Sequence, residues 1–450
     1  MEKILFRSTN FQSGLVTFKD AILKGQAPDY GLYVPTTLPH FTHKDILNFS
    51  MMEYYEVAFE IIKHFVCDFI PEKDLLKICQ QAYNFPVPVK QIDENHFILY
   101  LDKGPTASFK DFAARFLARI MSYIATREGI NLTVVVATSG DTGGAVAHAF
   151  LGLDNIRVIV LFPEKEISIR QRKQMTTLGK NIKAVAVKGT FDDCQALVKR
   201  AFNDPVLKHK NLTSANSINF GRLLPQSVYY FKAYVEIKRD DLVFSVPSGN
   251  FGNLMGGVLA REMGVPVKKF IVAVNENNEF PEFLKTGVYQ PVVPSKKCSS
   301  NAMNVGHPSN LARLIDLYGG WLTDERDQNG NVIKKGVMKR QPDIELMRKH
   351  FISFSISDDE VDRTIKYIYE KYHIIIEPHG AVSIAAAIKA NINHPVCCLE
   401  TADPAKFPEK IKEVLNIEPP VPETLAHLDF LEEQFTVIEN DYQQLVDIII

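Results

Sequence analysis

A lysine at the predicted start of a helix is the first residue in this chain whose surroundings favour covalent chemistry. Lys110 follows an apolar run at residues 97–101 and a turn at Gly104-Pro105, and apolar side chains recur at helical spacing after it. An amine at such a joint of strand, turn and helix is partly desolvated, which lowers its pKa and allows it to form a Schiff base. A solvated lysine in a first helical turn is the ordinary alternative, and Lys110 alone does not decide between the two.

Two glycine-rich turns are predicted to bind anions. Residues 137–150 (ATSGDTGGAVAHAF) and residues 246–257 (VPSGNFGNLMGG) each carry a predicted strand into a predicted helix. Backbone N–H groups at the start of such a helix attract an anion, and glycines let the backbone come close to it. Neither turn has the spacing of a P-loop or of a dinucleotide-binding fingerprint. A purely structural turn is the alternative for each one taken alone.

The amine and the two turns together match one cofactor. A molecule that carries a phosphate and an aldehyde would occupy one turn and bond to Lys110, which leaves the other turn for a substrate carboxylate. Pyridoxal phosphate has these two groups. A third predicted strand end is followed by Thr401, whose hydroxyl could face the ring nitrogen of this cofactor.

Motifs along nearly the whole chain carry a resemblance to a known family. They are, in order, ST at 8–9, GLYVP at 31–35, GPT at 104–106, SFKD at 108–111, TSGDTG at 138–143, NSIN at 216–219, PSGNFGN at 247–253, PSN at 308–310 and TADPAKF at 401–407. In this order and spacing the chain resembles the threonine synthases, which belong to the fold-type-II pyridoxal-phosphate enzymes, related to the tryptophan synthase β subunit.

The resemblance implies a role for particular residues and no metal site. It implies that Lys110 forms the Schiff base with pyridoxal phosphate and that Thr401 contacts the pyridine nitrogen. The backbone that would hold the cofactor phosphate belongs to Gly249, Asn250, Phe251, Gly252 and Asn253. The residues that would bind substrate are Thr106, Ser108, Thr138, Ser139, Gly140, Asp141, Thr142, Asn216, Ser217, Asn219 and Arg222. Within that set, residues 138–142 would take the α-carboxylate and residues 216–222 the phosphate of the substrate.

The reaction implied is the conversion of O-phospho-L-homoserine and water to L-threonine and phosphate, by γ-elimination and β-hydration, the last step of threonine biosynthesis. Another eliminating enzyme of the same fold, such as a threonine or serine dehydratase, is one alternative. Arg222 argues against it, because a dehydratase has no substrate phosphate to bind. A catalytically silent homologue that binds phosphorylated ligands is the other alternative, and the intact Lys110 argues against that.

Several residues depart from the pattern usual in the family. Lys103 and Asp403 stand where histidine is usual, Gly380 follows His379 where threonine is usual, and Gly221 replaces a larger residue. None of them removes the Schiff-base lysine or the phosphate loop, but they leave substrate preference and rate open. We interpret His379 as a hydrogen-bonded structural group, and Lys406 as a packing residue with a surface charge.

The elements that must position these residues are predicted to form an α/β protein. Apolar, β-branched runs at 133–137, 157–161, 183–187, 242–246, 270–274 and 396–399 alternate with helical segments, which predicts two open, mostly parallel sheets covered on both faces. The predicted division is a mostly helical domain at 1–90, a first α/β domain at 91–235 with Lys110 and the substrate loop, and a second at 236–450. The second would contain the phosphate loop, an irregular surface insertion at about 275–345 and C-terminal helices. Ser357 and Glu360 form a predicted capping box for a helix that reaches residue 372.

The composition excludes several classes of partner. The 450 residues carry a formal net charge of -2, so neither nucleic acid nor an anionic membrane is expected as a bulk electrostatic partner. The N-terminal segment lacks the apolar core of a secretory signal, and no run of about 18 apolar residues occurs. The six scattered cysteines indicate neither a disulfide framework nor a zinc site. A cytoplasmic enzyme acting on a small molecule is therefore expected, and the sequence leaves open whether it is a monomer or a homodimer.

Overall fold

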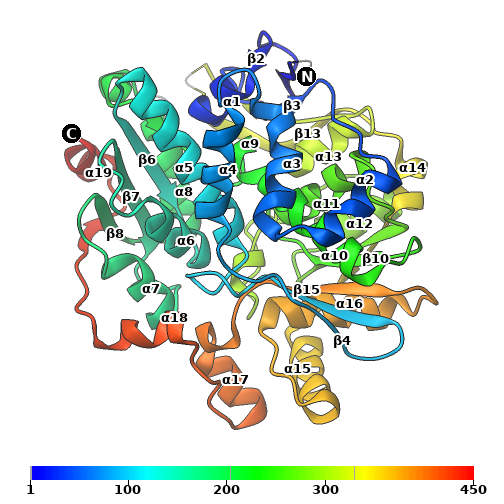
Figure 1. Cartoon of the computed structure of the whole chain (residues 1–450). Helices are drawn as coiled ribbons and strands as arrows, with labels where there is room; N and C mark the ends of the chain where they lie inside the picture. Colours follow the sequence, from blue (N-terminus) through cyan, green and yellow to red (C-terminus); the bar gives the residue numbers. More distant parts are fainter. Residues whose placement is uncertain (1–2, 203, 329) are drawn as a thin grey trace.

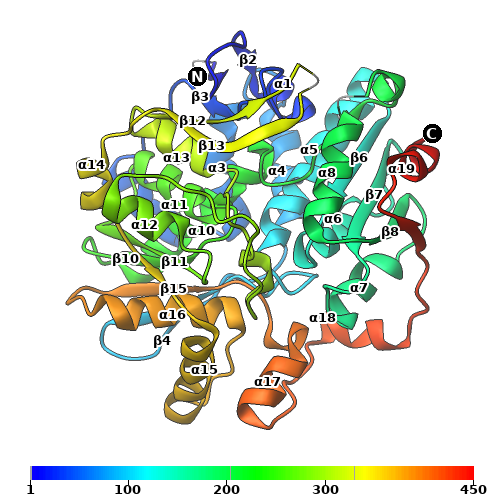
Figure 2. The same cartoon turned by 180° about the vertical axis from the view of Figure 1, so that it is seen from behind.

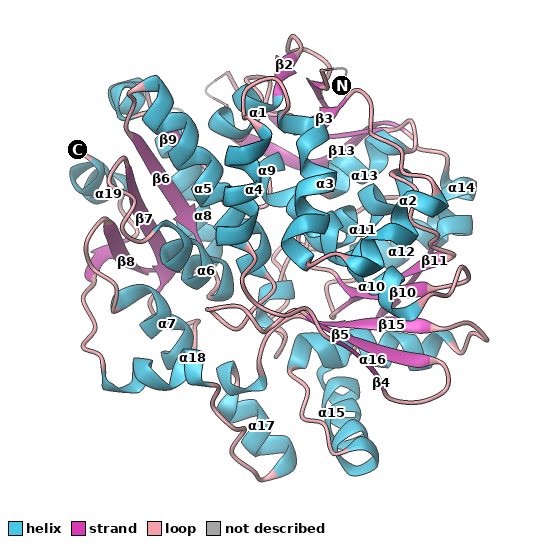
Figure 3. Cartoon of the chain, in the orientation of Figure 1, coloured by secondary structure: helices cyan, strands magenta, loops and turns pink. Residues whose placement is uncertain are grey.

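Two β-sheets form the framework of the computed structural model, which describes residues 3–202, 204–328 and 330–450 (Figures 1 and 3). The larger sheet has the strand order β14-β11-β10-β15-β5-β4, and the other has the order β16-β8-β7-β6-β9. All neighbouring strands are parallel except β4, which runs antiparallel to β5. The fold therefore confirms the predicted α/β class with mostly parallel sheets.

The strands of the larger sheet are β4 (Val89–Gln91), β5 (His96–Tyr100), β10 (Val243–Pro247), β11 (Lys269–Val274), β14 (Phe351–Ser355) and β15 (Val396–Glu400). Those of the smaller sheet are β6 (Leu132–Ala137), β7 (Ile156–Pro163), β8 (Ile182–Lys188), β9 (Leu212–Thr213) and β16 (Thr436–Glu439). Every residue of β6, β10 and β15 is buried. Helices on both faces of a parallel sheet explain why these strands read as continuous apolar runs.

The helices pack around these sheets and over the N-terminal part of the chain. The N-terminal region contains α1 (Phe18–Lys24), α2 (His43–Asn48), α3 (Tyr54–Val66) and α4 (Glu72–Ala82). The middle of the chain contains α5 (Lys110–Glu128), α6 (Asp141–Phe150), α7 (Ile169–Thr176), α8 (Phe191–Phe202), α9 (Phe220–Leu223), α10 (Pro225–Ile237) and α11 (Gly252–Glu262). The remainder contains α12 (Glu279–Thr286), α13 (Leu311–Leu317), α14 (Ile344–His350), α15 (Asp358–Tyr372), α16 (Pro378–Ala390), α17 (Pro408–Leu415), α18 (Glu423–Ala426) and α19 (Tyr442–Ile449). No helix in these described ranges is long and apolar enough to cross a bilayer.

Two small antiparallel sheets lie side by side at one end of the molecule (Figure 2). Strands β1 (Leu5–Ser8), β2 (Val16–Thr17) and β3 (Tyr33–Pro35) form one, and the hairpin β12 (Trp321–Arg326) and β13 (Val332–Arg340) forms the other. The indole N–H of Trp321 donates to Asn10 Oδ1 at 3.2 Å, which joins the two. The predicted surface insertion therefore contains a hairpin that packs on the N-terminal strands.

Strand pairing crosses the predicted domain ranges. Strands β4 and β5 precede Lys110 in the chain, yet they pair within the sheet of the second α/β range. Strand β16 comes near the C-terminus and pairs with β8 in the other sheet. In Figure 1 the segment from α17 passes along the lower edge to α18 and then rises along the left side to α19, beside the smaller sheet. The division at residues 90 and 235 itself stays a prediction, since pairing assigns strands to sheets and not residues to domains.

The predicted capping box is present at the start of α15. The backbone N–H of Glu360 donates to Ser357 Oγ at 3.3 Å, and the N–H of Ser357 donates to Glu360 Oε2 at 2.9 Å. Ser357→Ala should therefore lower the free energy of unfolding by about 1 kcal/mol, because one N–H of the first turn loses its acceptor. Urea unfolding followed by circular dichroism measures this change. Ser357→Asp keeps an acceptor and is the matched control; an equal loss in both variants would contradict the assignment.

Candidate active site

Lys110 and Thr401 lie next to each other because their strands are neighbours. Strands β5 and β15 are parallel, so their carboxyl ends meet at one edge of the sheet. Beyond that edge the two chain segments stay together: the N–H of Phe109 donates to the Thr401 carbonyl at 2.9 Å, and Ser108 pairs with Ala402. Two residues almost 300 positions apart thus reach one site, as expected for the carboxyl ends of strands in an open α/β sheet.

The turn that precedes Lys110 is organised by Asp111. Its carboxylate accepts hydrogen bonds from the backbone N–H and the hydroxyl of Thr106, both at 2.8 Å. A Cβ at Gly104 would lie 2.4 Å from Asp111 Oδ2, so this position must be glycine. Burial raises the pKa of Asp111 to about 6. Asp111 therefore fixes the turn, and the polar groups of Thr106, a predicted substrate residue, are engaged in it.

The amine of Lys110 lies in a strongly charged environment. Part of the side chain is exposed, but desolvation by the surrounding protein lowers the pKa of the amine to about 8. Four charged side chains act on it: Asp141 and Glu377, which raise its pKa, and Arg222 and Lys406, which lower it. A lysine with this pKa has a substantial fraction of neutral amine near neutral pH, as covalent chemistry with an aldehyde requires.

The turn at residues 247–253 forms a cradle at the start of α11. A Cβ at Gly249 would lie 2.7 Å from the Ala302 carbonyl oxygen, so no side chain fits there. The first helical N–H groups have no partner within the helix, and Phe251, at φ 61°, directs the backbone into it. The Asn310 amide donates to the Asn250 carbonyl at 2.9 Å, which braces the turn from the side of α13.

The second glycine-rich turn is closed by Thr138 at the start of α6. Thr138 Oγ1 accepts from the N–H groups of Gly140 at 3.0 Å and Gly143 at 2.8 Å. Gly140 has φ 133°, and a Cβ there would lie 2.6 Å from the Gln171 amide carbon. Ser139 and Thr142 are partly exposed beside it. Thr138 thus uses the N–H groups of Gly140 and Gly143, and the N–H groups that a ligand could reach are those of residues 139, 141 and 142.

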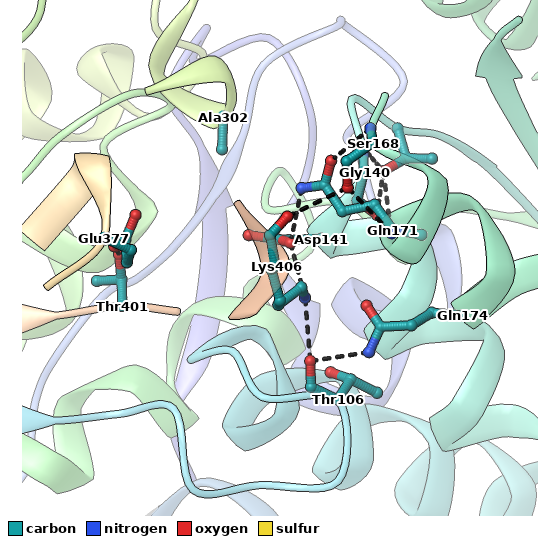
Figure 4. A network of polar contacts seen from close by, with 12 residues as sticks. Thr106, Gly140, Asp141, Ser168, Gln171, Gln174, Ala302, Glu377, Thr401 and Lys406 are labelled. Atoms are coloured by element: carbon teal, nitrogen blue, oxygen red, sulfur yellow. Dashed lines mark hydrogen bonds and ion pairs between the residues drawn. The ribbon is translucent and has the colours of Figure 1, made fainter. Parts of the chain in front are cut away.

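Lys406 is a central residue of the site, and its interpretation as a surface charge is wrong. The side chain is fully buried; its ammonium lies 2.7 Å from Asp141 Oδ1 and donates to the Thr106 carbonyl at 3.0 Å (Figure 4). Gln171 donates to the same Asp141 oxygen at 3.0 Å, and Gln174 donates to the Thr106 carbonyl at 3.0 Å. Burial alone would raise the pKa of Asp141, but the cations of Lys406 and Lys110 hold it at about 2.

The residues predicted to bind the substrate phosphate separate into two groups. Asn216 and Ser217 line a cavity of about 240 Å³, together with Asn250 and the N-terminal Thr9. Asn219 is instead buried in the start of α9: its amide donates to the carbonyls of Ile22 at 2.8 Å and Ser214 at 2.9 Å, and its oxygen accepts from Gly221. The side-chain groups of Asn219 are therefore engaged in holding α9.

Arg222 is fully buried but only partly paired. One terminal nitrogen donates to the Ala215 carbonyl, whereas Nε has no hydrogen-bond partner among the described residues. The other fully buried arginine, Arg313, donates to the carbonyls of Tyr33, Ser217 and Ile218 and to the Asn310 side chain. Burial lowers the pKa of Arg222 to about 10. Arg222 thus retains donor capacity that Arg313 has already used.

The site residues that sequence reasoning missed act through long-range contacts. Besides Lys406, they include Glu377, whose Oε1 accepts from the Thr401 hydroxyl at 3.2 Å. Tyr229 and Tyr230 of α10 are buried and hold Asn253: their hydroxyls lie 2.6 and 2.8 Å from its Oδ1. Two sequence signals were available for Lys406: its place in the TADPAKF motif at 401–407, and its position shortly after a strand end.

The described residues fit a cofactor that carries a phosphate and an aldehyde. A glycine cradle with open N–H groups lies at α11, and a lysine of lowered pKa lies at α5. Several buried polar atoms lack a protein partner among the described residues: Ser108 Oγ, Asn216 Oδ1, Arg222 Nε and Asn253 Nδ2. Buried polar atoms are normally satisfied, so these four atoms on predicted site residues are positions where a ligand could supply the missing partner.

The buried ion pair makes a prediction for stability. Lys406→Met should lower the free energy of unfolding by about 3–5 kcal/mol near neutral pH, because it leaves the Asp141 carboxylate buried and without its cation. In the wild type the folded-state pKa of Asp141 lies below its ordinary value of 3.8, so its stabilising contribution is complete above about pH 4 and is lost toward pH 2. In the variant burial raises this pKa, so the difference between the two proteins should narrow as the pH falls.

Urea unfolding of both proteins between pH 4 and pH 8 measures this difference. Lys188→Met is the matched control, since Lys188 pairs with Glu439 on the exposed surface. Its unfolding midpoint should stay close to that of the wild type at every pH. A Lys406→Met protein as stable as the control would show that the ion pair contributes little.

Comparison with known proteins agrees with this geometry. A family model described as "Pyridoxal-phosphate dependent enzyme" matches residues 83–399, and models for the threonine synthase N terminus and C-terminal region match residues 5–83 and 380–449. The threonine synthase of Haemophilus influenzae is 38% identical over 441 residues, 96% of each chain. That of Escherichia coli is 38% identical over 416 residues, 91% of each chain.

Solved structures extend the similarity to three dimensions. The pyridoxal-phosphate-bound threonine synthase of Brucella melitensis superposes with a TM-score of 0.91 at 35% identity, covering 99% of this chain and 98% of that one. The yeast threonine synthase gives a TM-score of 0.89 at 32% identity with the same coverage. A threonine deaminase from Solanum lycopersicum, at 16% identity and a TM-score of 0.55, shares the fold alone. This chain belongs to the threonine synthase family of pyridoxal-phosphate-dependent enzymes.

Proposed function

We propose that this protein converts O-phospho-L-homoserine and water to L-threonine and phosphate, with pyridoxal phosphate held between Lys110 and the turn at residues 249–253. The observation that carries the proposal is the setting of Lys110: an amine of lowered pKa on which the charges of Asp141, at the start of α6, and of Arg222 act. Pyridoxal phosphate supplies an aldehyde that takes up the substrate amine and a ring that withdraws electrons from the bonds at the α-carbon. The remaining tasks fall to side chains and backbone of this chain.

Lys110 has the properties needed to move protons at the substrate. With a pKa of about 8, its amine can both accept and release a proton near neutral pH, which is the condition for a general base that later acts as an acid. We assign it the removal of the α-proton and its return. The ion pair of Asp141 with Lys406 fixes the start of α6 near the Lys110 amine, so the groups around this amine are held in place.

The two ends of the substrate are assigned to different turns. The N–H groups at the start of α6 that Thr138 does not use suit the α-carboxylate. The substrate phosphate is assigned to Asn216 and Ser217, which line the cavity, and to Arg222, whose Nε has no hydrogen-bond partner among the described residues. Asn219 supports this group indirectly, since its side chain is bonded within α9.

The direct test is product analysis. Incubation of the holoenzyme with O-phospho-L-homoserine should release phosphate and threonine in equal amounts, and Lys110→Ala should lower the rate by more than about 10³-fold, since it removes the proton-transfer group. Lys90→Ala, at an exposed lysine of β4, is the control and should retain the wild-type rate. Faster release of ammonia from threonine or serine than of phosphate from phosphohomoserine would identify a dehydratase instead. Binding of phosphohomoserine without turnover would identify a silent homologue.

A second test addresses substrate specificity. Arg222→Gln should lower kcat/KM for O-phospho-L-homoserine by about 10- to 100-fold, because charge-assisted hydrogen bonds to phosphate are lost. Its effect on slow turnover of an unphosphorylated amino acid should be much smaller. Arg313→Gln is the matched control: it removes an equally buried arginine of which each guanidinium nitrogen donates within the protein, so it should affect both substrates alike. An equal loss for both substrates in Arg222→Gln would show that the phosphate binds elsewhere.

A further inference from the structure

The contacts behind Thr401 determine the direction of its hydroxyl hydrogen. Thr401 Oγ1 lies 3.2 Å from Glu377 Oε1, and the two side chains are adjacent in Figure 4. Between a hydroxyl and an ionised carboxylate only the hydroxyl can donate. The direction of this hydrogen bond therefore depends on whether Glu377 is ionised.

Four donors surround the Glu377 carboxylate. Oε1 accepts from the Gly380 N–H at 2.9 Å and from the Thr401 hydroxyl, and Oε2 accepts from the His379 N–H at 2.7 Å and from His379 Nδ1. The Nδ1 proton follows from the other side of the ring, where the Ala302 N–H donates to Nε2 at 3.1 Å. The N–H groups of His379 and Gly380 and the protonated His379 Nδ1 can only donate, so both oxygens of Glu377 are acceptors without any contribution from Thr401. The carboxylate is therefore ionised, and the Thr401 hydroxyl is its fourth donor.

Glu400, which contacts Glu377, is the protonated member of this buried pair of acids. Glu400 Oε1 accepts from the Glu377 N–H at 2.9 Å, while its Oε2 has no hydrogen-bond partner among the described residues. Burial, and then the charge of Glu377, raise the pKa of Glu400 well above its ordinary value. Glu400 is thus neutral and Glu377 carries the charge. Asp403, the next acid in sequence, is engaged elsewhere: its Oδ1 accepts from the Ala405 N–H at 2.9 Å.

We infer that Glu377 fixes the Thr401 hydroxyl as a hydrogen-bond acceptor and thereby holds the ring nitrogen of pyridoxal phosphate in its protonated form. A hydroxyl has one hydrogen, so after donation to Glu377 the Thr401 oxygen offers only lone pairs. A ring nitrogen that faces those lone pairs can bond to them only if it carries a proton. The inference rests on the proposed contact between Thr401 and the ring nitrogen.

This arrangement gives Thr401 an effect that its residue type does not predict. A free threonine hydroxyl can rotate and donate to an unprotonated ring nitrogen. Here the hydroxyl hydrogen of Thr401 is already donated to the Glu377 carboxylate, so it is not available to the ring nitrogen. A protonated ring withdraws electrons more strongly, which favours proton loss from the carbons of the bound substrate. Glu377 is therefore a positioning residue that acts on the cofactor through Thr401.

The protonation state can be read directly by ¹⁵N NMR of the holoenzyme reconstituted with pyridoxal phosphate labelled at the ring nitrogen. The wild type should show the resonance of a pyridinium. Glu377→Gln should move it toward the resonance of a neutral pyridine, because the new amide can donate to Thr401 and free its hydroxyl hydrogen. Thr401→Ser, which keeps the hydroxyl, should retain the pyridinium. A neutral ring nitrogen in the wild type overturns the inference without any variant.

A third variant separates this inference from the proposed site. Thr401→Val removes the acceptor and should move the resonance toward neutral pyridine. If Thr401→Val leaves the resonance unchanged, the ring nitrogen faces another group and the proposed cofactor contact is wrong. If Thr401→Val moves it but Glu377→Gln does not, the contact holds and the role of Glu377 is wrong. Far-ultraviolet circular dichroism of each holoenzyme verifies that the variants compared are folded.

Discussion

Charges buried around one amine impose the strongest constraint on this structure. Moving a charged group out of water is costly unless a partner and hydrogen bonds replace the water. Around Lys110 protein groups take the place of water: Lys406 pairs with Asp141, and Glu377 accepts four hydrogen bonds. Gln171 and Gln174 donate to the same two acceptors as Lys406, which are Asp141 Oδ1 and the Thr106 carbonyl. Most of the site is consequently held in place by contacts within the protein, and the atoms without partners are the ones a ligand must reach.

The fold meets this constraint by bringing distant segments to one edge. The turn before Lys110, the start of α6 and the turn after β15 come from three regions of the chain, and Lys406 contacts the first two from the third. Asp141 begins α6, which follows strand β6 of the smaller sheet, whereas Lys406 follows strand β15 of the larger sheet. The ion pair therefore joins the two sheets at the site. A division of the chain into consecutive domain ranges does not describe this site, because the two partners of the ion pair, Asp141 and Lys406, lie in different ranges.

The sequence predicted the elements well and the network around them poorly. Periodicity and turn chemistry are local, so the buried strands and the capping box at Ser357 could be predicted and were confirmed. The strands β14 and β16 were missed because their short runs, FISFS and TVIE, mix polar residues with apolar ones. Lys406 and Glu377 carry no periodic signal, and their partners are fixed only when the sheets assemble. Asn219 shows the reverse error, since its residue type suits a phosphate but its amide is used within α9.

Two departures from the family pattern add charges near the site. Lys103 and Asp403 stand where histidine is usual. The ammonium of Lys103 pairs with Asp102 at 2.7 Å, and its charge also lowers the pKa of Asp403 against the effect of burial. Gly380 is explained by the same edge of the sheet: a Cβ there would lie 1.5 Å from Glu400 Oε2, so the neutral acid fills the space that a threonine would need. Glu400 is adjacent to Thr401 and is neutral, so the negative charge that the Thr401 hydroxyl contacts belongs to Glu377.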